Sequence, residues 1–216
     1  MSSRPTALLF DWDNTLVDSW GVLHATMNET LAAMGQATWS RAEAEQRIRA
    51  SMRDSFPILF GERWPEAEKI FYSTYERLHI DTLQACPGAE ELLAWAAESG
   101  FYMGVVSNKR GAFLRAEATA LGWNRYFRKL AGAGDAARDK PAREHVEAAL
   151  VPGEMTMGAH IWFIGDTDID LLCARNTGCV GVLVRAQPPA EGEFAELAPD
   201  HYFPDLAALR AALANR

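Results

Sequence analysis

Short apolar runs alternate with segments of helical periodicity along most of the chain. A run of about four to eight apolar residues between turn formers is typical of a buried strand, whereas apolar residues three and four positions apart line one face of a helix. Strands are predicted at residues 6–10, 101–106, 128–132, 161–164 and 180–184. Because strands that alternate with helices are typical of a parallel sheet covered on both faces, we predict a three-layer α/β fold.

Proline and glycine bound the helices predicted between these strands. Pro87 stands at the start of one helix and Gly100 follows its last turn, which is the asymmetry expected of helix ends. Gly122 and Gly178 end two further helices in the same way. Helices are predicted at residues 88–99, 111–121, 142–150, 168–176 and 204–214. The stretch 186–199, which contains three prolines, is predicted to be irregular.

One long block interrupts the alternation directly after the first strand. It shows helical periodicity, as in Leu23, Met27 and Leu31, and no convincing strand, and Gly35 is a plausible stop for its first helix. We therefore predict an all-helical domain inserted into the α/β fold. The predicted domains are a core of residues 1–17 and 86–216 and an inserted helical cap of residues 18–85.

Composition and charge narrow the range of partners. The 216 residues have a formal net charge of −8, which makes the chain a poor candidate for binding a nucleic-acid backbone. Cys86, Cys173 and Cys179 match no zinc-site spacing and predict reduced thiols in a cytoplasmic protein. The apolar run Ala7–Phe10 is too short for a signal peptide or a membrane span. We expect no nucleic-acid or membrane partner, and both a monomer and a homodimer stay open.

Two carboxylates stand where the first predicted strand ends. Asp11 and Asp13 are separated by one residue, so their side chains can share one face of an extended segment. Such a pair suits magnesium, which prefers oxygen ligands. It also allows one carboxylate to attack as a nucleophile while the other transfers a proton. Taken alone, the pattern is more often a solvated acidic turn.

Two further segments offer groups that bind phosphate. Ser107, Asn108 and Lys109 end the second predicted strand, where a hydroxyl and a backbone amide can hold phosphate oxygens. The alternative for them is a helix N-cap. Lys140 precedes Pro141 near the start of a predicted helix and can pair with a phosphate or with a nucleophilic carboxylate, whose pKa it would lower. The alternative is an ordinary surface lysine.

The fourth predicted strand ends in a dense group of acids. Asp166, Asp168 and Asp170 lie within five residues and should repel one another unless a cation sits among them. A helix N-cap explains one of these carboxylates but not all three. The segment therefore favours metal binding.

The four segments together resemble the motifs of the haloacid dehalogenase-like hydrolase superfamily, over nearly the whole chain and in the family's order. An Asp-x-Asp-x-Thr after an apolar strand matches residues 11–15, a Ser after a strand matches Ser107, a Lys before Pro matches Lys140, and Gly-Asp-x-x-x-Asp matches residues 165–170. The first and fourth motifs are specific, whereas the other two gain meaning only in this context. The resemblance implies a Rossmann-like core and a mobile helical cap.

The resemblance also implies roles for the matched residues. Asp11 would be the nucleophile that forms an aspartyl-phosphate, and Asp13 would protonate the leaving alcohol and then activate water. Lys140 would hold the transferred phosphoryl group. The implied substrate contacts are Ser107, Asn108, Thr15 and Lys140. The implied ligands of the one cofactor, Mg²⁺, are Asp11, Asp13 through its backbone carbonyl, Asp166 and Asp170.

Single positions refine the expected reaction. Members of the superfamily that cleave carbon–halogen or phosphonate bonds lack an acid at the place of Asp13, so its presence favours phosphate esters. Asn14 stands where Gly is common and tolerates left-handed backbone well. Arg143 replaces a common second Pro, which affects helix entry more than chemistry. The size of the inserted block resembles that of phosphoglycolate phosphatases and implies a small phosphorylated metabolite, phosphoglycolate-like or a sugar phosphate.

The substrate itself stays open on the sequence. Arginines of the inserted block can grip a carboxylate or a second phosphate, although most such charges are solvated. These arginines are Arg41, Arg47, Arg49, Arg53 and Arg63. A phosphosugar mutase of the same superfamily, or a catalytically silent metal-binding regulator, is the alternative to a phosphatase.

Overall fold

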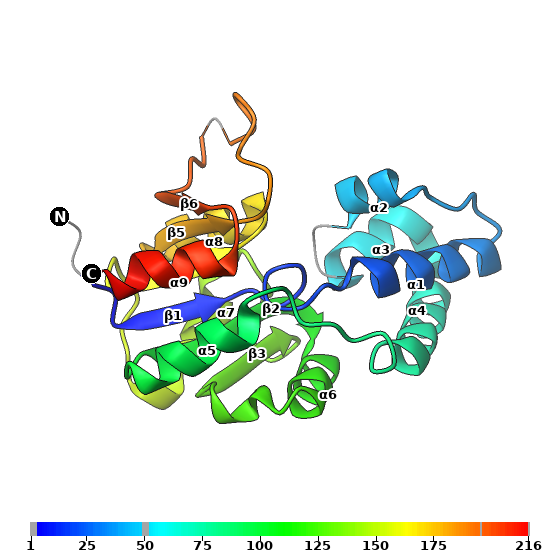
Figure 1. Ribbon diagram of the computed structural model, residues 1–216. Helices are drawn as coiled ribbons and strands as arrows, with labels where there is room; N and C mark the ends of the chain where they lie inside the picture. Colours follow the sequence, from blue (N-terminus) through cyan, green and yellow to red (C-terminus); the bar gives the residue numbers. More distant parts are fainter. Residues whose placement is uncertain (1–3, 49–51, 195, 216) are drawn as a thin grey trace.

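A six-stranded parallel sheet forms the centre of the protein (Figure 1). The computed structural model describes residues 4–48, 52–194 and 196–215. The strands are β1 (Ala7–Phe10), β2 (Tyr102–Arg110), β3 (Lys129–Ala133), β4 (Ile161–Gly165), β5 (Val180–Val184) and β6 (His201–Phe203). Their order in the sheet is β3-β2-β1-β4-β5-β6. This is the order of a doubly wound, Rossmann-like fold, so the predicted fold class is confirmed.

Helices cover both faces of this sheet. One face is packed by α5 (Ala89–Glu98), α6 (Gly111–Ala120) and α9 (Leu206–Ala214), and the other by α7 (Arg143–Leu150) and α8 (Asp168–Thr177). Short 3₁₀ turns lie at Gly61–Arg63, Trp123–Arg125 and Val151–Gly153. Because side chains alternate along a strand, β1 contributes Leu8 and Phe10 to the first core and Ala7 and Leu9 to the second. β1 is buried on both faces, as expected of a central parallel strand.

Four helices lie beside the sheet and have a core of their own (Figure 1). They are α1 (Trp20–Ala33), α2 (Arg41–Arg47), α3 (Met52–Phe60) and α4 (Trp64–Leu78). We call residues 20–48 and 52–78 the helical unit. Its core includes Leu31, Phe56 and Phe71, which are nearly inaccessible to solvent. A separate apolar core is what an independently packed unit requires.

The two chain segments that join the helical unit to the sheet run side by side. The backbone amide of Asp18 donates to the carbonyl of Gln84 at 2.9 Å, and the amide of Cys86 donates to the carbonyl of Leu16 at 2.8 Å. An antiparallel bridge joins residues 17 and 85 between them. Chain movement in either segment is therefore coupled to the other.

The structure corrects three details of the predicted elements. β2 does not stop before Ser107 but continues to Arg110, with a shift of register after Val106. β6 was not predicted, because three half-buried residues at a sheet edge give little apolar signal. α7 begins at Arg143, one residue later than predicted, and Lys140 lies ahead of it, as expected.

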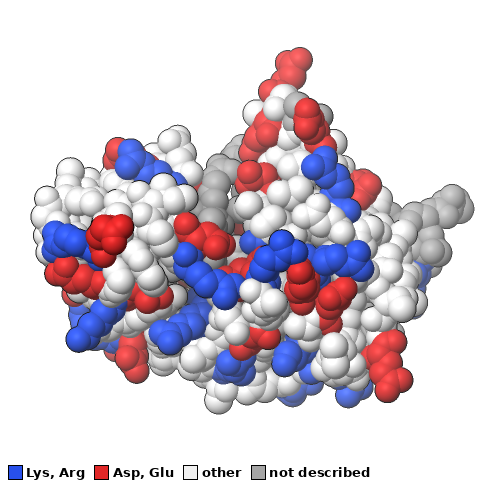
Figure 2. Space-filling model, turned by 180° about the vertical axis from the view of Figure 1, so that it is seen from behind, with Lys and Arg blue, Asp and Glu red and all other residues white. Residues whose placement is uncertain are grey.

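Neither the surface charges nor the cysteines point to a particular function. Basic and acidic side chains are interspersed over the face seen in Figure 2. Among the described residues, no helix combines the length and the hydropathy that a membrane span requires. Cys173 and Cys179 are buried, Cys86 is half-buried, and all three are free thiols.

Candidate active site

The strand order brings the predicted acids together. β1 and β4 are neighbours in the sheet, but the next strand along the chain lies on opposite sides of this pair: β2 beside β1, and β5 beside β4. In open parallel sheets, the crevice that binds ligands opens at such a point, outside the carboxyl ends of the strands. Asp11 follows β1 and Asp166 follows β4. Oxygen atoms of Asp11, Asp166 and Asp170 lie within 4.8 Å of one another. This donor set fits a hard divalent cation such as Mg²⁺.

Asp170 is placed by a tight local turn. It occupies the first turn of α8, where its carboxylate accepts hydrogen bonds from the Thr167 hydroxyl at 2.8 Å and the Thr167 amide at 3.1 Å. A Cβ atom at Gly165 would lie 2.2 Å from the Asp170 carboxyl carbon. Glycine is therefore required at the end of β4 because only it leaves room for this carboxylate.

Lys140 neutralises part of the acidic cluster. Its ammonium nitrogen lies 2.7 Å from Asp11 and 2.7 Å from Asp170, and its side chain is almost fully buried. Burial alone would lower the pKa of Lys140, but the two carboxylates together raise it above its ordinary value. The lysine is thus held as a cation against the predicted nucleophile.

The loop before α7 is fixed from two sides. The side-chain amide of Asn108 donates to the backbone carbonyl of Lys140 at 3.3 Å. The backbone amide of Lys140 donates to Nδ1 of His145 at 3.0 Å, and Nε2 of that ring donates to the carbonyl of Gly132. Burial and the nearby Lys140 charge lower the pKa of His145, which matches a neutral ring with this single tautomer. Asn108 therefore supports Lys140 as well as facing the pocket.

The cluster has more negative charge than Lys140 can balance. Burial, together with the charges of Asp170 and Asp13, raises the pKa of Asp11 to about 7 despite the nearby lysine. Burial and the charges of Asp170 and Asp11 raise the pKa of Asp166 well above its ordinary value. A cation bound among these oxygens would relieve the repulsion and hold the carboxylates ionised.

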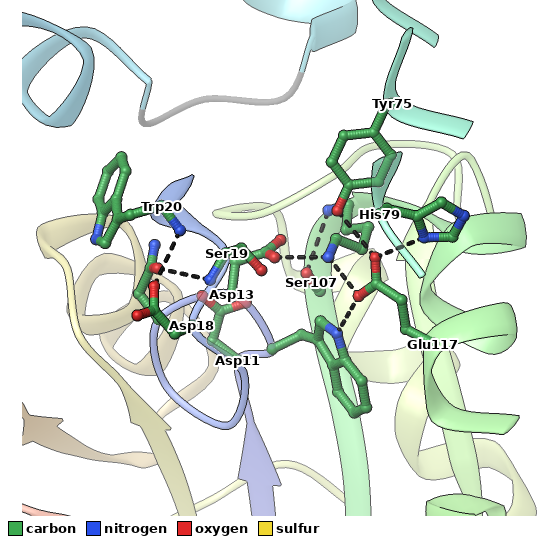
Figure 3. Close-up of polar contacts among 12 residues, drawn as sticks. Asp11, Asp13, Asp18, Ser19, Trp20, Tyr75, His79, Ser107 and Glu117 are labelled. Carbon is green, nitrogen blue, oxygen red and sulfur yellow. Dashed lines mark hydrogen bonds and ion pairs between the residues drawn. The ribbon is translucent and has the colours of Figure 1, made fainter. Parts of the chain in front are cut away.

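Asp13 points away from this cluster and meets a different cation. Its carboxylate lies 2.6 Å from the ammonium of Lys109 in a close ion pair, and that ammonium lies 2.5 Å from Glu117. Tyr75 and His79, which come from the helical unit and the segment after it, also contact Glu117 (Figure 3). This network could not be predicted from the sequence, because Glu117 fits the solvated face of an amphipathic helix.

A pocket lies between the strand ends and the helical unit. Asp11, Asp13, Ser107, Asn108 and Lys140 line it from the sheet side. The helical unit contributes apolar and aromatic side chains only, from the residues that the structure describes. These are Trp20, Leu23, Ile48, Met52, Phe71, Tyr72 and Tyr75.

Two groups of predicted site residues lie elsewhere. Thr15 is buried and donates to Asp166 at 3.2 Å, so it contacts a candidate metal ligand rather than the pocket. Four of the five arginines named as candidate substrate contacts pair with carboxylates instead of lining the pocket. The pairs are Arg41–Glu45, Arg47–Glu43, Arg53–Asp139 and Arg63–Glu66. Arg49 lies outside the described residues.

Comparison with known proteins identifies the class of protein. A family model described as haloacid dehalogenase-like hydrolase matches residues 8–184, so the chain belongs to that family. The chain is 27% identical to a hydrolase of the HAD superfamily from Ehrlichia chaffeensis, with a TM-score of 0.70 over 100% of this chain and 98% of that one. A haloacid dehalogenase-like hydrolase from Bacteroides fragilis, 20% identical, shares the fold with a TM-score of 0.87 over 95% of this chain and 100% of the other.

Curated relatives narrow the class further. A phosphoglycolate phosphatase from Pseudomonas fluorescens is 29% identical over 82% of this chain and 69% of its own length. A 5'-nucleotidase from Pseudomonas aeruginosa is 28% identical over 95% of this chain and 94% of its own length. These findings confirm the predicted class, a phosphatase-type hydrolase of the haloacid dehalogenase-like family.

Proposed function

We propose that this protein is a Mg²⁺-dependent phosphatase that hydrolyses a small phosphate monoester through an aspartyl-phosphate on Asp11. The observation that supports it most is the cluster of Asp11, Asp166 and Asp170, whose oxygens lie within 4.8 Å of one another. The ammonium of Lys140 lies 2.7 Å from two of these carboxylates, those of Asp11 and Asp170. Phosphoryl transfer depends mainly on positioning and on neutralising charge, and this cluster supplies both.

The metal would be held by Asp11, Asp166 and Asp170, with the backbone carbonyl of Asp13 as a further ligand. Once bound, Mg²⁺ supplies positive charge to the phosphoryl oxygens and to the attacking carboxylate. The hydroxyl of Thr15 donates to Asp166, which orients that ligand, as groups behind metal ligands commonly do.

The reaction proceeds in two displacements at phosphorus. A carboxylate oxygen of Asp11 forms a bond to phosphorus while the bond to the alcohol oxygen breaks, and Asp13 gives its proton to the departing alcohol. Asp13 then takes a proton from a water molecule, which attacks phosphorus and breaks its bond to Asp11. Inorganic phosphate leaves and both aspartates return to their starting state. Ser107, Asn108 and Lys140 hold the phosphoryl oxygens throughout.

We further propose that residues 18–85 act as a cap over a core of residues 1–17 and 86–216. The side-by-side connections at residues 16–18 and 84–86 are where the two parts would move relative to each other. Closure of such a unit excludes water from the pocket during transfer.

Phosphate release from a panel of small phosphate monoesters, with Mg²⁺ or with a chelator, tests this function. Wild type is expected to release phosphate only with Mg²⁺, and Asp11→Asn is expected to release none. Asp18→Asn, the same change at an exposed position nearby, serves as the control and should remain active. Metal-independent release, or release by Asp11→Asn above a few per cent of wild type, would contradict the proposal. Isomerised sugar phosphate in place of free phosphate would indicate the mutase.

A further inference from the structure

The side of the pocket that faces the phosphate-binding groups is apolar. Trp20 and Leu23 of α1, Met52 of α3 and Phe71 of α4 line it from the helical unit, and Phe113 of α6 lines it beside them. A small phosphorylated acid would bring its ionised carboxylate against these side chains. Such a group would lose hydration without gaining a partner, which is unfavourable.

The two buried cations of the pocket are already paired with carboxylates. Lys140 pairs with Asp11 and Asp170, and Lys109 pairs with Asp13 and Glu117. Arg110 also lines the pocket, with its guanidinium carbon 4.7 Å from the centre of the Tyr72 ring. It is exposed, so solvent and salt weaken its attraction for a carboxylate. Among the described residues, the pocket thus has no buried cation left for a carboxylate on the substrate.

We infer that the alcohol part of the substrate is aromatic or branched aliphatic and packs against the apolar side of the pocket, while its phosphate lies at Asp11. This inference rests on the proposed phosphatase function. It differs from what a small phosphorylated acid such as phosphoglycolate would require, because the binding free energy then comes from buried apolar area rather than from an ion pair.

Matched esters test the inference. Benzyl phosphate, ethyl phosphate and phosphoglycolate are all esters of alkyl alcohols, so none has the activated leaving group of a phenyl ester. We expect kcat/KM for benzyl phosphate to exceed that for phosphoglycolate by about tenfold or more. Leu23→Ala should lower the preference for benzyl over ethyl phosphate about three- to tenfold. Leu59→Ala, at a partly buried position that packs against the core of the same helical unit but does not line the pocket, should leave this preference unchanged.

The outcomes separate this inference from the function on which it rests. Asp11-dependent release that favours phosphoglycolate over benzyl phosphate would overturn the substrate class and leave the phosphatase intact. An unchanged benzyl preference in Leu23→Ala would overturn the assignment of the apolar side. Release from none of the esters would overturn both proposals.

A second inference concerns Glu117, a buried carboxylate outside the candidate metal cluster. One of its oxygens accepts from the indole N–H of Trp12 at 2.7 Å and from Lys109 at 2.5 Å. The other accepts from the hydroxyl of Tyr75 at 2.9 Å and from Nδ1 of His79 at 2.9 Å. Glu117 is 1% exposed, so all four bonds form away from water (Figure 3). Burial would raise the pKa of Glu117, but His79 and Lys109 lower it to about 2.

The four donors come from three parts of the molecule. Trp12 lies between the two aspartates that follow β1, and Lys109 lies at the end of β2, where it also contacts Asp13 at 2.6 Å. Tyr75 belongs to α4, and His79 directly follows that helix. Glu117 therefore joins the helical unit to the segment that places Asp13. A carboxylate with four donors in fixed directions restricts all of them at once.

We propose that Glu117 is a positioning residue, which fixes Lys109 and Trp12 so that Asp13 is aligned for proton transfer when the helical unit contacts the core. Glu117 does not itself touch the reacting atoms. Glu117 would affect the reaction through the Lys109–Asp13 ion pair. The position of Glu117 would in turn depend on the helical unit through its contacts with Tyr75 and His79. This proposal also rests on the proposed function of Asp13.

Glu117→Gln tests the proposal with little change in shape. We expect kcat to fall about 10- to 100-fold while KM stays within about threefold, since proton transfer is misaligned but the phosphate contacts remain. Tyr75→Phe, which removes one donor from the helical unit, should lower kcat by a smaller factor. Lys109→Met should lose most activity and Lys109→Arg should recover part of it.

Glu90→Gln provides a matched control. Glu90 also accepts from an indole N–H, a tyrosine hydroxyl and a cation, namely Trp123, Tyr126 and Arg125, but none of these residues lines the pocket. The kcat of the Glu90→Gln variant should equal that of wild type. An unchanged kcat in Glu117→Gln, an equal loss in Glu90→Gln, or a loss confined to KM would overturn the proposal. If Glu117→Gln does not fold, Tyr75→Phe and the Lys109 pair decide in the same way.

Discussion

Replacing Lys140 with methionine should destabilise the Mg²⁺-free protein strongly. The ammonium lies 2.7 Å from both Asp11 and Asp170, and its side chain is only 3% exposed. Methionine keeps much of the volume but removes the only described cation in contact with these two carboxylates. Removing one partner of a buried ion pair costs about 3–5 kcal/mol, because the remaining charge is left buried without compensation.

Mg²⁺ should restore part of this loss, since it would bind the same oxygens. At a hundredfold excess over its Kd, a ligand that binds only the folded state adds about 2.7 kcal/mol to the free energy of unfolding. Lys109→Met is the matched control. Lys109 is about equally buried, but it pairs with Asp13 and Glu117 rather than with Asp11 and Asp170. Mg²⁺ should therefore not restore the free energy of unfolding that Lys109→Met loses.

Urea unfolding of wild type and both variants at pH 8, with Mg²⁺ or with a chelator, measures these differences. We expect Lys140→Met to gain more stability from Mg²⁺ than wild type gains, because the metal replaces the missing charge. Lys109→Met should gain no more than wild type. A loss below about 1 kcal/mol for Lys140→Met without metal would refute the reasoning about buried charge. An equal Mg²⁺ gain in all three proteins would refute the shared site.

Two further predictions concern the same cluster. The raised pKa of Asp11, about 7 against an ordinary 3.8, means that the folded state binds this proton more tightly than the unfolded state. In the absence of metal, the free energy of unfolding should therefore fall as the pH rises from about 4 to 7, by up to about 4 kcal/mol for this group. Urea unfolding at several pH values measures this change. A free energy of unfolding that rises over this range in wild type but not in Asp11→Asn would contradict the prediction. Gly165→Ala should lower stability by about 1–3 kcal/mol and weaken Mg²⁺ binding, because its Cβ atom would lie 2.2 Å from the Asp170 carboxyl carbon. Unchanged Mg²⁺ affinity in a calorimetric titration of that variant would show that the position of Asp170 is not critical.

The sequence predicted the parts of the protein that depend on local pattern. The apolar strands end abruptly in acids, so Asp11 and Asp166 could be placed at strand ends, and parallel topology then brings those ends together. Asn14 adopts the left-handed backbone that its residue type tolerates, with φ of 61°. β6 was missed because a three-residue edge strand is too short to show a period.

Contacts between distant segments were beyond sequence reasoning. Glu117 lies 105 residues from Trp12 and 42 from Tyr75, and nothing in the helical pattern of α6 marks it as buried. The apolar lining of the pocket was also unforeseen, since periodicity does not tell whether a residue such as Leu23 faces the core of the helical unit or the pocket. Three of the arginines proposed as substrate contacts pair with acids three or four residues away, and Arg53 pairs with the buried Asp139.

The central claim is that the phosphoryl group passes through Asp11, and trapping that intermediate tests it most directly. Asp13→Asn should slow the attack of water, whereas an ester with an activated leaving group, such as 4-nitrophenyl phosphate, needs no proton from Asp13 in the first step. The phosphorylated enzyme should therefore accumulate when this ester, labelled in its phosphoryl group, is mixed with enzyme and Mg²⁺ and the reaction is stopped with acid. The account predicts label on the peptide that contains Asp11, sensitive to hydroxylamine as an acyl phosphate is. It predicts no label in the double variant Asp11→Asn, Asp13→Asn. Label on another residue, or turnover by Asp13→Asn without any labelled enzyme, would contradict the account.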